Sequence, residues 1–104
     1  VKANVKARWP EGQCYTLGHV ADGNLHFFVA PFEQGELHEA SDECVYGPLA
    51  ELGGSVSAEH GIGLDKLRWL PHSRSPAEIE LMRSLKRSLD PGNILNPGRV
   101  VANN

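Results

Sequence analysis

Hydrophobic residues at the start of the chain recur at helical spacing. Val1, Val5 and Trp9 lie four residues apart, and Pro10 ends the pattern. Residues 14–30 then favour strand, because β-branched and aromatic residues are frequent among them. An Asp-Gly pair at positions 22 and 23 divides this run, and Asp-Gly between strand-like segments is typical of a two-residue hairpin turn. The pattern predicts the end of a helix, which we expect to begin before residue 1, followed by a β-hairpin.

The apolar positions of residues 36–52 fit a second helix, which Gly53 ends. Pro48 lies inside this pattern and predicts a kink or an early end there. Residues 55–63 are expected to form a strand and then a loop, and residues 65–70 one or two helical turns. The order of the elements indicates an α+β fold, an antiparallel sheet with helices packed on one face.

A last helix is predicted to start at the segment SPAE, in which Ser75 is the cap and Glu78 closes a capping box. Apolar residues then line one face of this helix, and the segment Asp-Pro-Gly at 90–92 stops it. The apolar residues in question are Ile79, Met82, Leu85 and Leu89.

Composition narrows the possible functions. The 104 residues suffice for one domain, and ten basic against thirteen acidic residues leave a net charge of −3, which argues against nucleic-acid binding. No apolar run reaches the length of a membrane span. Two cysteines without a CxxC spacing indicate buried or half-buried thiols, which suits a cytoplasmic protein. The first residue is not Met, so we expect a processed chain or a fragment.

The predicted hairpin carries two histidines. With Asp22 and Gly23 at the centre of the turn, His19 faces His26, and directly opposed Cβ atoms lie about 4.5–5.5 Å apart. Two imidazoles at that separation can share one metal ion. The alternation places Leu17 and Phe28 on the same face, with Val20 and Leu25 on the other. The alternative interpretation is a pair of solvated or hydrogen-bonded histidines without a metal.

Residues 55–63, which read SVSAEHGIG, supply further candidates. Glu59 offers a third metal ligand, and His60 beside it offers a general base. The ligands do not follow the HExxH spacing, and Lys66 stands where a dinucleotide-binding GxGxxG motif needs its last glycine. The alternative is an ordinary surface loop.

Three segments in order carry a resemblance to a known family. Residues 18–26 (GHVADGNLH), 53–63 (GGSVSAEHGIG) and 89–99 (LDPGNILNPGR) resemble the C-terminal domain of the FAD-linked oxidases. These are the D-lactate, glycolate and D-2-hydroxyglutarate dehydrogenases with a flavin domain of the vanillyl-alcohol-oxidase type. The resemblance covers the chain from about Arg8 onward. It implies a ferredoxin-like cap domain, incomplete here, that covers the reactive face of FAD, while the FAD-binding domain is absent from this chain.

The resemblance also implies roles for single residues. His19, His26 and Glu59 match positions that bind a divalent metal, usually zinc, and His60 matches the catalytic base. The implied reaction oxidises a D-2-hydroxy acid to a 2-oxo acid. The metal holds the substrate oxygens, His60 takes the hydroxyl proton, and hydride leaves for the flavin. We expect the 104-residue chain by itself to be inactive.

Further residues follow from the same resemblance. Asn96 matches a cofactor-binding segment close to the flavin, and Lys66 is a candidate for the substrate carboxylate. Ala21 replaces a glycine that the family commonly has in its turn, and Phe28 stands where D-2-hydroxyglutarate enzymes often carry an asparagine. Phe28 is therefore a candidate substrate-binding residue that favours small or apolar 2-hydroxy acids.

Two other function classes compete with this interpretation. One is a stand-alone metal-dependent hydrolase that uses the same histidines, and the other is a non-catalytic module that binds a metal or a partner through the histidine face. The resemblance implies a small 2-hydroxy acid as substrate and leaves the electron acceptor unspecified. Homo-oligomers that associate through the apolar histidine face are a further expectation.

Overall fold

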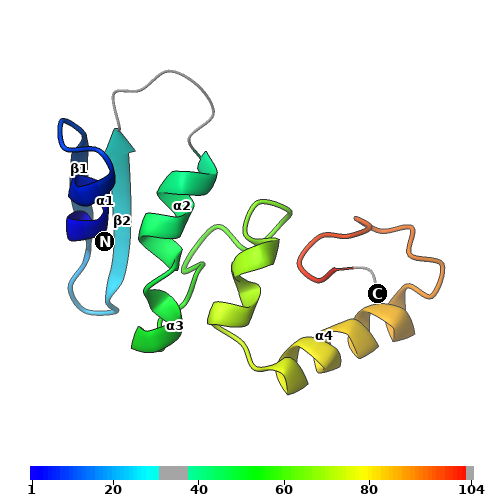
Figure 1. Ribbon diagram of the computed structural model, residues 1–104. Coiled ribbons are helices and arrows are strands. Elements are labelled where there is room, and N and C mark those ends of the chain that lie inside the picture. Colours follow the sequence, from blue (N-terminus) through cyan, green and yellow to red (C-terminus); the bar gives the residue numbers. More distant parts are fainter. Residues whose placement is uncertain (31–37, 103–104) are drawn as a thin grey trace. The chain divides into compact units, whose positions relative to one another are not determined.

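The computed structural model describes residues 1–30 and 38–102. The chain forms two compact units, Val1–Pro48 and Leu49–Asn104, and each is described here by itself. The helices and the two-stranded antiparallel sheet confirm the predicted α+β class (Figure 1). The elements are α1 (Lys2–Arg8), β1 (Gln13–His19), β2 (Asn24–Ala30), α2 (His38–Tyr46), α3 (Leu49–Leu52), the 3₁₀ helix η1 (Leu67–His72) and α4 (Pro76–Leu89).

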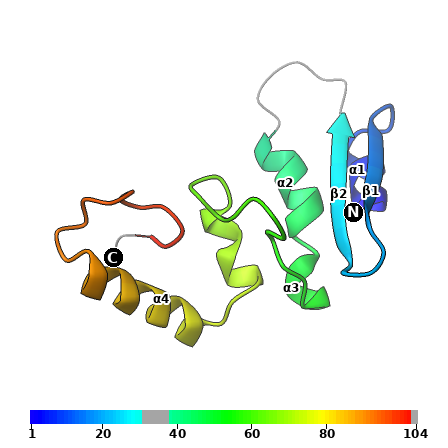
Figure 2. The ribbon, with the colours of Figure 1, turned by 180° about the vertical axis from the view of Figure 1, so that it is seen from behind.

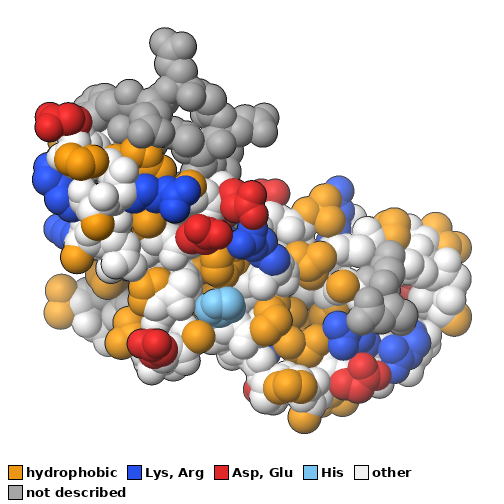
Figure 3. Space-filling model, viewed as in Figure 1, with side chains coloured by type: hydrophobic (Ala, Val, Ile, Leu, Met, Phe, Trp, Pro, Cys, Tyr) orange, Lys and Arg blue, Asp and Glu red, His pale blue; other side chains and the backbone are white. Residues whose placement is uncertain are grey.

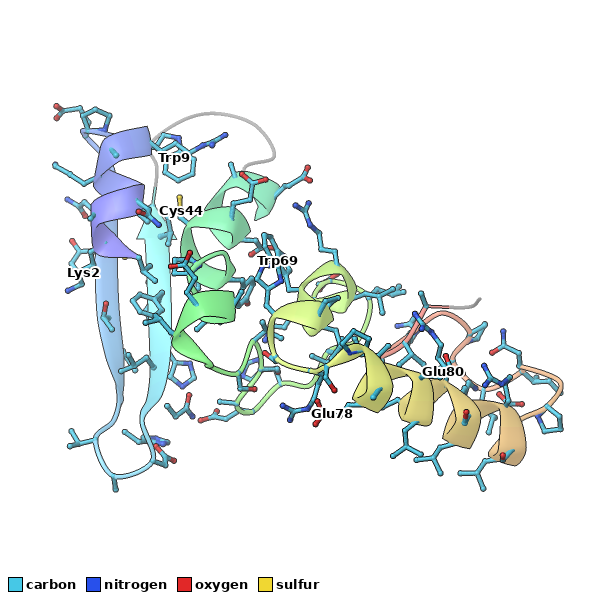
Figure 4. All side chains as sticks on the ribbon, turned by 60° about the horizontal axis from the view of Figure 1, so that its bottom comes forward. Lys2, Trp9, Cys44, Trp69, Glu78 and Glu80 are labelled. Carbon is cyan, nitrogen blue, oxygen red and sulfur yellow. The ribbon has the colours of Figure 1, made fainter. Side chains whose placement is uncertain are left out.

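The core of the first unit lies on one face of the hairpin. Val5 of α1, Trp9 and Cys44 of α2 are buried together, and Cys14 and Val29 of the strands pack against them. Figure 4 shows Trp9 and Cys44 in this region, and Figures 1 and 2 show α1 on a single side of the two strands. Both cysteines are free thiols, one buried and one half-buried, as predicted.

The hairpin register differs from the predicted one by two residues. His19 pairs with Asn24, and His26 pairs with Leu17, so the two histidines do not face each other directly. The turn is a four-residue loop, residues 20–23, in which the N–H of Gly23 donates to the carbonyl of His19 at 3.1 Å.

The side chain of Asp22 explains the longer loop. Its Oδ1 accepts the N–H of Asn24 at 3.1 Å, and Gly23 follows with a φ of +69°. Asp22 and Gly23 therefore close the end of a loop instead of forming its centre. Val20, expected on the core face, is fully exposed in this loop. A shift of two residues leaves every strand side chain on its predicted face, because the strand period is two.

Pro48 interrupts the second predicted helix as expected. α2 ends at Tyr46, the N–H of Gly47 bonds the carbonyl of Glu43 at 3.1 Å, and α3 begins after Pro48. Proline has no N–H to continue the ladder, so the helix breaks there. The predicted start at residues 36 and 37 lies outside the described residues.

α4 starts as predicted, and part of its apolar face is buried. The Ser75 hydroxyl accepts the N–H of Glu78, and the Glu78 carboxylate accepts the N–H of Ser75, which completes the capping box. Ile79 is buried with Leu70 and Val101, and Met82 packs against them. The last two leucines of the predicted apolar face are exposed: Leu85 and Leu89.

Residues 55–63 form no strand in the described structure, contrary to the prediction. The side chain of Ser73 bonds backbone groups of this segment that a neighbouring strand would otherwise bond. The Ser73 hydroxyl accepts the N–H of Val56 at 2.8 Å and donates to the carbonyl of Gly54 at 3.1 Å. The segment is held as an irregular loop, which carries Glu59 and His60.

Candidate functional site

One face of the hairpin combines imidazoles with exposed apolar side chains. Leu17 and Phe28 are 58% and 55% exposed, and Tyr15 lies opposite Phe28 in the register. His19 and His26 occupy the same face at diagonal positions, where neighbouring side chains are about 7–8 Å apart. Both imidazoles can approach one small ligand at this distance.

Asp22 orients the first of these histidines. The Nδ1 of His19 lies 3.3 Å from Oδ2 of Asp22, while the other oxygen of that carboxylate holds the hairpin loop. The pair is well exposed, so it adds little to stability. The contact through Nδ1 leaves Nε2 as the ring nitrogen that projects away from Asp22.

The Glu59–His60 pair lies at the exposed tip of a short closed loop. The Ser57 hydroxyl donates to the carbonyl of Gly61 at 2.7 Å, and Gly61 adopts a φ of +72°, which suits glycine. Lys66 donates from Nζ to the Ser57 hydroxyl at 3.3 Å. Lys66 therefore lies at the base of the loop that carries Glu59 and His60.

The segment with Asn96 is organised by a carboxylate that sequence reasoning missed. Asp90 is buried and accepts the N–H groups of Ile94 at 3.0 Å and Leu95 at 2.9 Å. Lys86 donates to the same carboxylate. This ammonium group and the two N–H groups lower the pKa of Asp90 from its usual 3.8 to about 2. The segment Asp-Pro-Gly at 90–92 predicted a turn, but the sequence did not predict that Asp90 is buried or that it pairs with Lys86.

Asn96 itself is exposed in the turn that follows, with a φ of +45°. Its carbonyl accepts the N–H of Arg99 at 3.2 Å. Further along, the N–H of Val100 donates to the carbonyl of Gly63 at 2.9 Å. This bond ties the C-terminal segment to the loop that carries Glu59 and His60, so these candidates of the second unit belong to one connected region.

The three predicted metal ligands fall in different units. His19 and His26 share a face of the first unit, and Glu59 belongs to the second. Across residues 1–30 and 38–102, no group of three or more His, Cys, Asp or Glu side chains could hold a metal ion. The structure therefore does not support the predicted metal site.

α4 carries mixed charge. Glu80 accepts from Arg87 at 2.7 Å and lies 3.6 Å from Arg83, and Figure 3 shows acidic and basic side chains next to one another there. The hydrogen bond from Arg87 is the main reason that the pKa of Glu80 is lowered.

Two cavities of about 290 Å³ adjoin this helix, and neither is lined by a predicted site residue. No helix in the described part of the chain is long and apolar enough to cross a membrane.

Comparison with known proteins decides the family. The family model described as FAD linked oxidases, C-terminal domain, matches residues 2–100. The chain belongs to the FAD-linked oxidase family. This result confirms the resemblance that the three sequence segments carried, and it covers both units of the chain.

Several curated relatives of this FAD-linked oxidase domain are dehydrogenases. D-2-hydroxyglutarate dehydrogenase of Stutzerimonas stutzeri (strain A1501) is 37% identical over 108 residues, which cover 98% of this chain and 23% of that protein. The mitochondrial D-2-hydroxyglutarate dehydrogenase of Rattus norvegicus is 50% identical over 77% of this chain and 15% of its own length. D-lactate dehydrogenase of Anaerostipes hadrus is 38% identical over 82% of this chain and 19% of its own length. The chain thus spans less than a quarter of each of these relatives.

Proposed function

We propose that this chain is the C-terminal, substrate-facing domain of an FAD-dependent dehydrogenase that oxidises a D-2-hydroxy acid to a 2-oxo acid. The observation that carries the proposal is the hairpin face on which His19 and His26 lie beside Leu17 and Phe28. Imidazoles can bind the polar end of a hydroxy acid, while apolar side chains exclude water from a hydride transfer. The names of the relatives, which include D-2-hydroxyglutarate and D-lactate dehydrogenases, support the same substrate class.

The residues of the second unit supply the proton chemistry in this proposal. His60 is the general base that takes the hydroxyl proton of the substrate, and its exposed place at the loop tip allows a substrate to reach it. Bound FAD supplies the acceptor for the hydride from carbon 2. Asn96 is the candidate that lies close to the flavin. The exposed apolar face around Phe28 is suited to cover a planar ring of this kind.

The divalent metal is proposed only from the sequence resemblance. His19 and His26 are the proposed first two ligands and Glu59 the third, but within each unit the described residues do not complete such a set. We therefore derive no step through a metal. Metal analysis of an intact protein that contains this domain tests the hypothesis. We expect about one divalent ion per chain, the number that a single ligand set holds, and loss of most of it in His26→Ala. Absence of the ion from the unmodified protein refutes the assignment.

The function is tested on an intact protein that combines this domain with a flavin-binding domain. We expect a bound flavin whose absorbance bleaches anaerobically when a D-2-hydroxy acid is added, while the L-enantiomer has a much smaller effect. A flavin that no 2-hydroxy acid reduces contradicts the proposal. Hydrolysis of simple esters or phosphoesters would favour the metal hydrolase instead, a class that the family assignment does not favour.

A further inference from the structure

The loop that carries Glu59 and His60 is closed by one side-chain hydrogen bond. The Ser57 hydroxyl reaches across three residues to the carbonyl of Gly61 at 2.7 Å. The intervening tip, residues 58–60, is exposed. Because the bond joins the two ends of the tip, it restricts the positions that Glu59 and His60 can reach.

Lys66 holds both ends of the same loop. Its backbone N–H donates to the carbonyl of Ile62 at 3.2 Å, and its Nζ donates to the Ser57 hydroxyl at 3.3 Å. Ser57 thus accepts from a cation while it donates to Gly61. Accepting a charged hydrogen bond polarises a hydroxyl and strengthens the bond that it donates. The contact between Lys66 and Ser57 is partly buried, so water screens it less than a surface pair.

The backbone at the base of the loop is also fixed. The Ser55 hydroxyl donates to the carbonyl of Ser57 at 3.0 Å and accepts the N–H of Ser57 at 3.4 Å. On the other side, Gly63 accepts the N–H of Val100 at 2.9 Å. The tip therefore projects from a base that is bonded on both sides, and Ser57 is the side chain that bridges it.

We propose that Ser57 and Lys66 are positioning residues, which hold the Glu59–His60 tip in the geometry needed for proton transfer. The inference rests on the proposed function, in which His60 is the base. It gives Lys66 a different role from the one expected from the sequence, because its ammonium group donates to the Ser57 hydroxyl. A misplacement of about 1 Å in such a tip costs up to about 100-fold in rate.

The first test is kinetic and uses the intact flavoprotein. Ser57→Ala should lower kcat about 10- to 100-fold while KM changes less than about threefold, since geometry is lost and substrate contacts are not. Ser57→Thr keeps the hydroxyl and should recover kcat to within about fivefold of the unmodified enzyme. Ser88→Ala is the matched control, because its hydroxyl donates within α4, to the carbonyl of Ser84 at 2.9 Å. Equal losses in Ser57→Ala and Ser57→Thr overturn the proposal, as does full activity of Ser57→Ala.

A double-mutant cycle separates positioning from substrate binding by Lys66. If Lys66 acts through Ser57, Lys66→Met lowers kcat with little change in KM, and the double variant is no worse than Ser57→Ala. If Lys66 binds the substrate carboxylate, Lys66→Met raises KM and its effect multiplies with that of Ser57→Ala. The second result refutes the positioning role.

Hydrogen exchange gives a readout that does not need activity. The protected amides in a peptide that covers residues 55–66 should exchange about fivefold faster in Ser57→Ala than in the unmodified protein, the usual effect of one lost hydrogen bond. Ser88→Ala should leave this exchange rate unchanged. If Ser57→Ala exchanges faster but the unmodified protein oxidises no 2-hydroxy acid, the proposed function fails while the role of Ser57 in holding the loop is confirmed. If the exchange of Ser57→Ala is unchanged in an active enzyme, the proposed function holds and the positioning proposal is wrong.

Discussion

Lys86 and Asp90 form an ion pair one helical turn apart at the end of α4, and the same carboxylate accepts the N–H groups of Ile94 and Leu95. Three donors thus converge on one side chain with 8% exposure. They fix the path of the chain from the end of α4 into the segment that contains Asn96. The Asp-Pro-Gly turn is built around this carboxylate, which must be ionised to accept all three donors.

We expect the stability of this turn to fall at low pH. The pKa of Asp90 is about 2 in the fold against a usual 3.8, chiefly because Lys86 bonds it. A lowered pKa means that the stabilisation is complete above the usual value and is lost as the pH falls towards 2. Asp90→Asn should therefore lower the melting temperature at pH 7 and weaken the acid dependence between about pH 4 and pH 2. Thermal unfolding between pH 7 and pH 2 measures the melting temperature of both forms, with the exposed Asp65→Asn as the control. If Asp90→Asn loses as much stability in acid as the unmodified protein, the role of Asp90 is contradicted.

The two strands approach closely at Gly18, so we expect a side chain there to destabilise the hairpin. A Cβ added there would lie 2.0 Å from the carbonyl oxygen of Asn24 and 2.9 Å from the Cα of Leu25, so the strands must separate. Gly18→Ala should cost about 1–3 kcal/mol, the usual cost of overpacking, and should displace His19. Val20→Ala in the exposed loop should cost less than about 0.5 kcal/mol. Denaturant unfolding compares the two variants, and equal stability would show that the hairpin tolerates a side chain at residue 18.

His60 and Glu59 should respond differently to substitution, although they are adjacent. His60→Asn removes the proposed proton acceptor, so kcat should fall about 10²–10⁴-fold with flavin content unchanged. Glu59→Gln keeps the base and removes a charge, so its loss should be smaller and should be partly reversed by added divalent metal if Glu59 is a ligand. Steady-state rates with and without metal distinguish the pair. Equal losses in both variants, without rescue, would mean that the assigned roles are wrong.

We expect Phe28 to set the substrate preference of the proposed dehydrogenase. Its ring lies on the histidine face and cannot hydrogen-bond a distal carboxylate. Small or apolar D-2-hydroxy acids should have a higher kcat/KM than D-2-hydroxyglutarate, and Phe28→Asn should shift the ratio towards the diacid by about tenfold, the scale of one charge-assisted hydrogen bond. Leu25→Ala alters the same strand on its other face and should leave the ratio unchanged. A strong preference of the unmodified enzyme for D-2-hydroxyglutarate would show that Phe28 does not face the substrate.

Local sequence patterns predicted much of the fold. The spacing of Val1, Val5 and Trp9 predicted α1, although the helix begins at Lys2 and not before residue 1 as expected. Ser75 with Glu78 predicted the start of α4. The break at Pro48 also appeared where it was expected. These features depend on residues within a few positions of one another, so propensity and capping suffice to predict them.

The alternation of the strands assigned the histidines to one face of the hairpin, and the structure agrees. The register followed from the loop instead, where the Asp22 carboxylate takes the N–H of Asn24 and lengthens the turn to four residues. A two-residue and a four-residue loop keep the same parity, so the sequence could assign the face but not the residue opposite His19.

The sequence by itself thus determined which helices form, which face of the hairpin carries the histidines, and to which family the three segments point. Only the tertiary structure decided that Val56 bonds to Ser73 and not to a strand, and that Asp90 is buried in an ion pair with Lys86. It also decided that Leu85 and Leu89 stay exposed although their spacing suits a buried face. The physical reason is that a periodic pattern specifies what a segment can bury or bond, whereas the partner that satisfies it comes from elsewhere in the chain.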